Sequence, residues 1–125
     1  MRHLIVTLLL LLGTLCLFAQ PYEGEWALKA GGVLEDVSKG IIVDAEGNYF
    51  VAGSFQGDAI FGKFILSGAG DRDVYVGKVS SEGDWLWVVS AGGSGVDRAN
   101  SIKLNKDGEI IVTGMFDGKA KFGSK

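Results

Sequence analysis

Two short segments place oxygen-bearing side chains at alternate positions, as calcium-binding loops do. The two sets are Asp44, Glu46 and Asn48, and Asn105, Asp107 and Glu109. A loop of the EF-hand kind needs a bidentate acid at its twelfth position, where this sequence has Phe55 and Phe116. Asp71 and Asp73, beside two glycines, form a further candidate pair. The same residue types are common in tight turns. We therefore expect no metal and no cofactor, and we keep calcium at these positions as the alternative.

Other catalytic chemistry has little support in the sequence. The stretch Gly92–Gly95 follows an apolar segment as a phosphate loop would, but no lysine follows it, and we interpret it as a turn between blades. Single carboxylates are spread along the chain, and no pair is singled out for glycoside hydrolysis. The single histidine and the single cysteine are His3 and Cys16, both in the N-terminal segment. We expect no catalytic residue in this chain.

Aromatic side chains could stack on sugars or fill a core. The candidates are Trp26, Tyr49, Tyr75, Trp85 and Trp87. They lie in segments that are apolar on both faces, which favours the core. The formal net charge is −3, and the positive charges are scattered singly. We therefore expect no nucleic-acid partner, because nucleic-acid binding needs clustered Lys and Arg.

The N-terminus is typical of a signal peptide. A short basic head precedes an apolar run over residues 4–18, which is shorter than the ~20 residues of a bilayer span. Ala19 is the small residue expected before a cleavage site. We predict a signal peptide over residues 1–19, cut between Ala19 and Gln20, with an uncleaved membrane anchor as the alternative. The expected location is outside the cell or at its surface, or in the periplasm, with no membrane contact after cleavage.

The chain from Trp26 to Gly62 is repeated at Trp87 to Gly123, 61 residues later and without a gap. Fourteen of the thirty-seven aligned positions are identical. A period of this size indicates a repeat architecture. The region 20–125 is therefore predicted to be one repeat region.

The pattern within the repeat predicts short antiparallel strands joined by tight turns. The four expected strands of one blade are Ile41–Asp44, Tyr49–Phe55, Asp73–Val79 and Trp85–Ala91, with Ala59–Leu66 as an extended excursion. Both faces of these strands are apolar, so each sheet needs a layer above and below it. Face-to-face stacking of small sheets in a β-propeller provides both layers. A two-sheet sandwich is the alternative.

The order of Trp, Gly-Gly, Asp, an Ile run, Gly-Asn and aromatic-x-Val-x-Gly resembles the SBBP-type β-propeller repeat of secreted bacterial proteins. In the first copy the resemblance rests on Trp26, Gly31, Gly32, Asp36, Ile41, Asp44, Gly47, Asn48, Tyr49, Val51 and Gly53. In the second copy it rests on Trp87, Gly92, Gly93, Asp97, Ile102, Gly108, Val112 and Gly114. The second copy departs from the pattern at Asn105 and Glu109. The resemblance implies an architecture and no particular ligand.

The expected fold is all-β, a partial β-propeller after a signal peptide. It comprises one complete four-stranded blade at about residues 41–91, part of a second blade, and an outer strand at Trp26–Ala30. Asp36 and Asp97 should accept backbone N–H groups where one blade passes to the next. We expect an incomplete propeller that needs further blades or self-association to cover its exposed faces.

The expected function is that of a non-catalytic repeat scaffold. Its loops would present a binding or adhesion surface to an unidentified protein or glycan. Two alternatives stay open. One is the propeller portion of an extracellular carbohydrate-active hydrolase whose catalytic residues lie outside this chain. The other is a nonfunctional truncated product.

Overall fold

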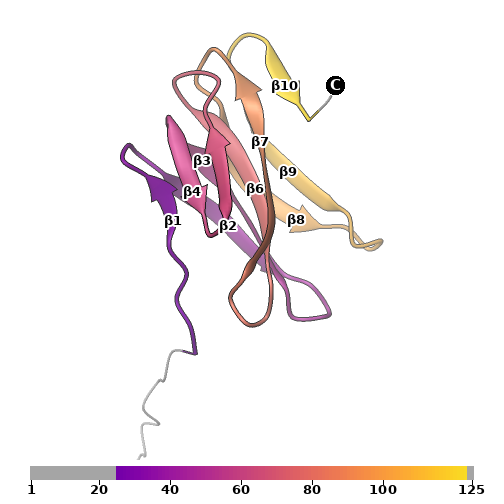
Figure 1. Cartoon of the computed structure of the whole chain (residues 1–125). Helices are drawn as coiled ribbons and strands as arrows, with labels where there is room; N and C mark the ends of the chain where they lie inside the picture. The colour runs from indigo at the N-terminus through magenta and orange to yellow at the C-terminus, as the bar shows by residue number, and fades with distance from the viewer. Residues whose placement is uncertain (1–24, 124–125) are drawn as a thin grey trace, which may run out of the picture.

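The computed structural model describes residues 25–123, which form ten β-strands and no helix that could cross a membrane (Figure 1). The predicted signal peptide and its cleavage site at Ala19 and Gln20 lie outside the described residues. The strands are β1 (Ala30–Gly32), β2 (Val37–Val43), β3 (Tyr49–Phe55), β4 (Asp58–Phe61), β5 (Phe64–Ser67), β6 (Asp73–Val79), β7 (Trp85–Gly93), β8 (Arg98–Leu104), β9 (Ile110–Met115) and β10 (Ala120–Phe122). All strand pairs within the three sheets are antiparallel.

The largest sheet has the strand order β10-β7-β6-β3-β2. Its four strands β2, β3, β6 and β7 are the predicted blade, so the expected all-β, blade-like fold is confirmed. The other two sheets are the three-stranded β1-β4-β5 and the hairpin β8-β9, which begins the second blade. None of the three sheets closes into a barrel.

Tight turns set the register of the blade. In the β2–β3 turn, Asp44 Oδ1 accepts the backbone N–H of Glu46 at 3.1 Å and of Asn48 at 2.8 Å. Gly47 then adopts a φ of 84°, which favours glycine. The equivalent turn in the second copy has the same design, with Asn105 as acceptor and Gly108 at a φ of 78°. The predicted tight turns are therefore confirmed at these positions in both copies.

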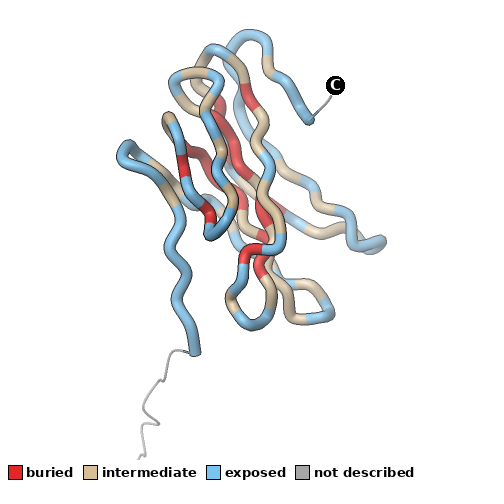
Figure 2. The backbone as a smooth tube through the Cα atoms, viewed as in Figure 1, coloured by how far each residue is buried: buried red, intermediate tan, exposed pale blue. Residues whose placement is uncertain are grey.

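Buried residues lie along the central strands of the blade (Figure 2), and they form a core cluster on each of its two faces. The first core cluster contains Phe55, Ala59, Phe61, Tyr75, Val79 and Trp85. The second core cluster contains Phe50, Ala52, Val74, Ala99 and Ile102. Alternate residues of β3 enter opposite clusters, as the sequence predicted, because successive strand residues point to opposite faces. The second cluster joins the blade to the β8–β9 hairpin, so the two repeat copies stack face to face.

The same backbone irregularity occurs in both copies. The β2–β3 register shifts between Ser38 and Gly40, and the β8–β9 register shifts between Ala99 and Ser101, which are the equivalent positions. A Cβ atom at Gly53 would lie 2.0 Å from the Val37 carbonyl oxygen. The recurring glycine is therefore required by the close approach of the bulged strand.

Two expectations about strand boundaries were wrong. The excursion Ala59–Leu66 is largely a hairpin, β4–β5, that turns at Gly62 with a φ of 60°. The segment predicted as an outer strand, Trp26–Ala30, becomes a strand only at Ala30, and β1 pairs with β4 instead of lying at the edge of a four-stranded blade. In the second copy the end of β7 pairs with β10 in the same way, Ala91 opposite Phe122. Each Gly-Gly segment therefore links one blade to the short strand of the next.

Candidate functional site

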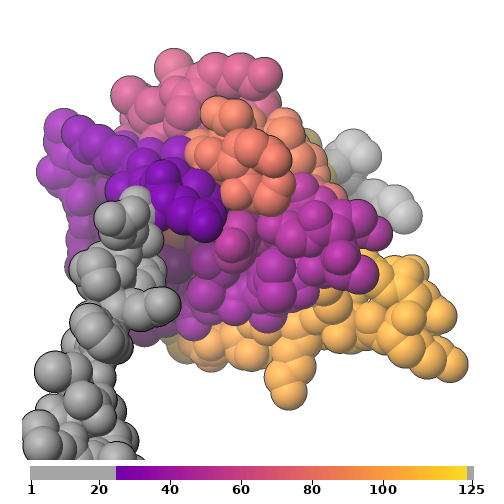
Figure 3. Space-filling model, turned by 90° about the horizontal axis from the view of Figure 1, so that it is seen from below, coloured from indigo at the N-terminus to yellow at the C-terminus, as the bar shows by residue number. Residues whose placement is uncertain are grey.

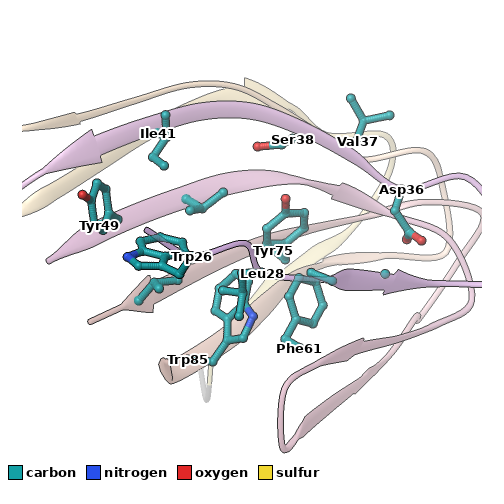
Figure 4. Close-up of a pocket in the computed structure, with 14 residues that line it drawn as sticks. Trp26, Leu28, Asp36, Val37, Ser38, Ile41, Tyr49, Phe61, Tyr75 and Trp85 are labelled. Atoms are coloured by element: carbon teal, nitrogen blue, oxygen red, sulfur yellow. The ribbon is translucent and has the colours of Figure 1, made fainter. Parts of the chain in front are cut away.

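A cavity of about 350 Å³ lies on the face of the blade that β8–β9 does not cover (Figure 4). The N-terminal segment, residues 26–31, forms one wall, and residues of β2, β3, β4, β6 and β7 form the others. Its lining residues are mainly apolar and include Trp26, Leu28, Asp36, Ser38, Ile41, Tyr49, Val51, Phe61, Tyr75 and Trp85. This cavity is the candidate site, because its walls come from both ends of the first repeat.

Trp26 fixes the N-terminal segment against the blade. Its indole Nε1 donates a hydrogen bond of 3.0 Å to the Ser81 carbonyl oxygen. Its ring meets Tyr49 edge-on, with ring centroids 5.4 Å apart. A Cβ at Gly83 would lie 2.7 Å from the Trp26 ring, so only glycine leaves room for it there. The wall of the cavity is therefore held by specific contacts.

The cavity is suited to apolar packing and offers little acid–base chemistry. Burial raises the pKa of Tyr75, against the effect of a hydrogen bond with Ser38, and the neighbouring Asp36 adds to the rise. The phenol therefore stays protonated at neutral pH. Two polar atoms among the lining residues, Asp36 Oδ1 and Trp85 Nε1, are shielded from solvent and have no hydrogen-bond partner. Because these two atoms are buried and the lining is mainly apolar, the recess is suited to packing against an apolar surface.

The second repeat copy shows how the equivalent face packs. Shifting its residues by 61 converts Ser38, Ile41, Tyr49 and Val51 into Ala99, Ile102, Ile110 and Val112. All four shifted residues pack in the second core cluster, where the second copy meets the first blade. The cavity face of the first copy is therefore equivalent to the surface through which the second copy packs on the first blade.

A buried carboxylate fixes the passage from one blade to the next. Asp97 is fully buried, and its Oδ2 accepts the Gly93 N–H at 2.7 Å while its Oδ1 accepts the Asp117 N–H at 2.9 Å. Asp36 accepts the Gly32 N–H at 2.6 Å in the first copy. Both residues therefore accept backbone N–H groups at the blade junction, as the sequence predicted.

The structure places the calcium candidates in separate turns. Asp44 and Asn105 lie in equivalent hairpin turns, with Glu46 and Asp107 at their exposed tips. In both turns the first residue's oxygen is taken by backbone N–H groups. Within residues 25–123, no three His, Cys, Asp or Glu side chains gather closely enough to hold a metal ion. These candidates are therefore not brought together.

The third candidate pair is divided between surface and core. Asp71 is exposed, whereas Asp73 is 2% exposed and accepts the N–H groups of Ala69 at 2.8 Å and Gly70 at 3.3 Å. Asp73 therefore closes the Gly-rich turn that precedes β6. In the stretch Gly92–Gly95, Gly92 and Gly93 end strand β7 and the chain bends at Ser94 and Gly95, so the turn is shorter than predicted. The N–H of Gly93 is donated to Asp97.

Asp44, in the β2–β3 turn, also forms an ion pair with Lys78 of β6, and this pair gives a testable pH dependence. Its Oδ2 lies 3.2 Å from Lys78 Nζ. Partial burial acts to raise the pKa of Asp44, but hydrogen bonds from Asn48 and the charge of Lys78 outweigh it and hold the pKa at about 2. Because the folded-state pKa lies below the ordinary value of 3.8, the stabilisation is present above that pH and is lost as pH falls towards 2.

We expect Asp44→Asn to lower the melting temperature at pH 7, since the amide keeps the turn but loses the ion pair. The difference from the unaltered protein should shrink between pH 4 and about pH 2. Thermal unfolding followed by circular dichroism over this range checks it. Asp107→Asn, at an exposed tip, is the control and should show no such trend; an Asp44→Asn difference that does not change with pH contradicts the prediction.

The cavity itself was not predicted from the sequence. Trp26, Tyr49, Tyr75 and Trp85 were assigned to core packing, and Tyr75 and Trp85 are indeed buried at 5% and 8% exposure. Trp26 is 37% exposed and lies at the mouth of the recess. The signal that could have revealed the recess was the repeat itself, because the stacking face of the first copy has no copy before it among the described residues.

Comparison with known proteins shows a distant similarity to a repeat-containing protein. The chain is 24% identical over 120 residues to an uncharacterized WD repeat-containing protein of Acanthamoeba polyphaga mimivirus. The match covers 87% of this chain and 9% of the viral protein, so the chain spans less than a tenth of that relative's length. No family model and no solved structure matches. This distant homology supports a repeat scaffold and contains nothing specific to the SBBP type.

The comparison corrects the expected localisation. The relative is a viral WD repeat-containing protein, and nothing in its description links it to secretion. The assignment to the cell exterior, the cell surface or the periplasm is therefore withdrawn. It rested on sequence features of residues 1–19, which lie outside the described part of the chain.

Proposed function

We propose that the chain is a non-catalytic β-propeller repeat scaffold of the SBBP type, whose loops present a binding surface to a protein or glycan partner. One observation carries the proposal: the second copy packs on the first blade through the residues that, shifted by 61, form the uncovered cavity face of the first. A unit that carries matching upper and lower stacking faces is the building block of an extended repeat array.

The loop between β1 and β2 is the strongest candidate for the partner-binding surface. Val33 is 98% exposed and Leu34 is 54% exposed at its tip. The equivalent residues in the second copy are Ser94 and Gly95, so the repeat architecture does not require an apolar tip. The bidentate ion pair between Arg72 and Glu35 anchors this loop to the turn before β6, with an Nη2–Oε2 distance of 2.6 Å. An anchored loop with exposed apolar side chains is a suitable contact surface.

The stacking basis of the scaffold is tested by lengthening the chain. A further copy of residues 63–123, placed after Gly123, should complete the second blade and cover its outer face. Because nearest-neighbour interfaces add to the stability of repeat proteins, we expect the melting temperature to rise by about 5 °C or more. Differential scanning calorimetry measures the change.

The control is the same lengthened chain with Asp in place of the added copy of Ile102. It should lose most of the gain, because a charge then lies in the stacking face. An unchanged melting temperature in the first lengthened chain would contradict the proposed stacking. Hydrolysis of chromogenic glycosides that Asp73→Asn abolishes would contradict the non-catalytic part of the proposal.

A further inference from the structure

Two largely apolar faces remain partly exposed after the two repeat copies have stacked, although Trp26 packs on Tyr49 at the edge of one of them. The receiving face consists of Ser38, Ile41, Val43, Tyr49 and Val51 on β2 and β3. The donor face consists of Ile111, Thr113 and Met115 on the outer side of β9. Ile41 and Val43 are 61% and 56% exposed, and Ile111 and Met115 are 50% and 46% exposed. Neighbouring exposed apolar side chains are a feature of interaction surfaces.

The two faces are the two halves of an interface that the chain already makes once. Shifted by 61, the receiving face becomes Ala99, Ile102, Leu104, Ile110 and Val112, which pack on the first blade. Shifted back by 61, the donor face becomes Phe50, Ala52 and Ser54, which form the other side of the same contact. The structure therefore specifies which surface fits on each uncovered face.

The faces also point in opposite directions. Figure 3 shows the N-terminal segment and the β8–β9 region on opposite sides of the molecule, with the first blade between them. A molecule with complementary faces on opposite sides associates head to tail, each copy receiving one neighbour and donating to another. We propose that a second copy of this chain docks its donor face onto the receiving face. This rests on the stacking in the proposed function and names the partner.

The contact between copies is weaker than the one within the chain, for two reasons. Ser54 Oγ accepts the Ala99 N–H at 3.2 Å within the chain, and Met115, the equivalent of Ser54, has no hydroxyl to do so. Lys103 replaces Ile42, which packs against the second core cluster. A lysine at such a face opposes association. The assembly is therefore concentration-dependent, and Lys103 is the residue that limits it.

Cross-linking between differently tagged full-length copies tests the proposal. All copies carry Cys16→Ser, so that the introduced cysteine is the one thiol. One copy carries Ile41→Cys and the other carries Ile111→Cys, and a short bis-maleimide joins thiols that lie close together. We expect a mixed dimer at several-fold higher yield than with Ile65→Cys in place of Ile41→Cys. Ile65 is 68% exposed on β5, outside both faces, so it is a matched control.

A second variant tests whether Lys103 limits the association between copies. Lys103→Ile should increase the association constant roughly tenfold, because an apolar side chain then enters the interface in place of a charge. Sedimentation velocity of the full chain measures this, with Lys121→Ile as control. Residues 1–24 are present in every sample. Any association through them therefore contributes equally to the test variant and to the control.

Equal cross-linking yields from Ile41→Cys and Ile65→Cys, or an association constant that Lys103→Ile leaves unchanged, would overturn the proposal. The stability of the lengthened chain separates this failure from failure of the proposed function. If the added repeat raises the melting temperature while the cross-link is absent, blades stack within one chain and do not stack between copies.

Discussion

Replacing Asp97 with alanine should reduce the free energy of unfolding by about 3–5 kcal/mol, because two backbone N–H groups lose a charged acceptor inside the protein. The two donors belong to Gly93 and Asp117, on either side of the junction between the first and second blades. Small domains have a total stability of roughly 5–15 kcal/mol. The substitution therefore removes a large part of what holds the second hairpin in place. Urea denaturation followed by tryptophan fluorescence measures the loss.

The repeat supplies a matched control for this substitution. Asp36 occupies the equivalent position but is half-buried and accepts one backbone N–H, from Gly32. Asp36→Ala should therefore cost less, about 1–2 kcal/mol. Equal losses at the two positions would show that the number of accepted hydrogen bonds does not determine the effect. A loss below 1 kcal/mol for Asp97→Ala would contradict the junction role itself.

The strands of the blade could be predicted because local signals agreed with one another. Asp44 and Gly47 mark a turn by side-chain hydrogen bonding and by positive φ, and both devices recur at Asn105 and Gly108. The alternation of Phe50 and Ala52 against Val51 indicated a strand buried on both faces. These signals depend on residues close in sequence, so the sequence alone was sufficient to find them.

The β4–β5 hairpin was missed because its strands are apolar on both sides. Ala59 and Phe61 point inward at 0% and 1% exposure, whereas Ile60 and Ile65 are exposed. With isoleucine on the outer side, the inward and outward positions cannot be told apart by hydrophobicity. The hairpin is fixed instead by its pairing with β1, which depends on residues nearly thirty positions away.

The candidate site could not be predicted for a related reason. One wall of the cavity depends on Trp26, whose indole donates a hydrogen bond to the carbonyl of Ser81, 55 residues along the chain, and so holds the N-terminal segment against the blade. Nothing in the local sequence of either residue indicates that contact. The equivalence of Ile41 and Ile102, in contrast, was visible in the repeat. It identifies the cavity face as a stacking surface, because Ile102 packs in the second core cluster.

Replacing Phe55 with alanine should also cost about 3–5 kcal/mol, because it leaves a cavity in a closed core. Phe55 is fully buried in the first core cluster. The equivalent residue in the second copy, Phe116, is 38% exposed and contacts Phe122 with ring centroids 4.7 Å apart. Phe116→Ala should cost about 1 kcal/mol or less, since the side chain is not enclosed. Urea denaturation of the two variants gives the comparison.

This pair of phenylalanines tests whether the repeat rebuilds the same core. The two positions have the same residue type and differ only in the strands that surround them. Strands β4, β6 and β7 enclose Phe55, and their counterparts around Phe116 are absent from the described chain apart from β10. In the chain lengthened by a further copy of residues 63–123, the cost of Phe116→Ala should therefore rise towards that of Phe55→Ala. If it stays near its original value while the added copy is folded, the repeat does not rebuild the same core, and the stacking proposed for this protein is wrong.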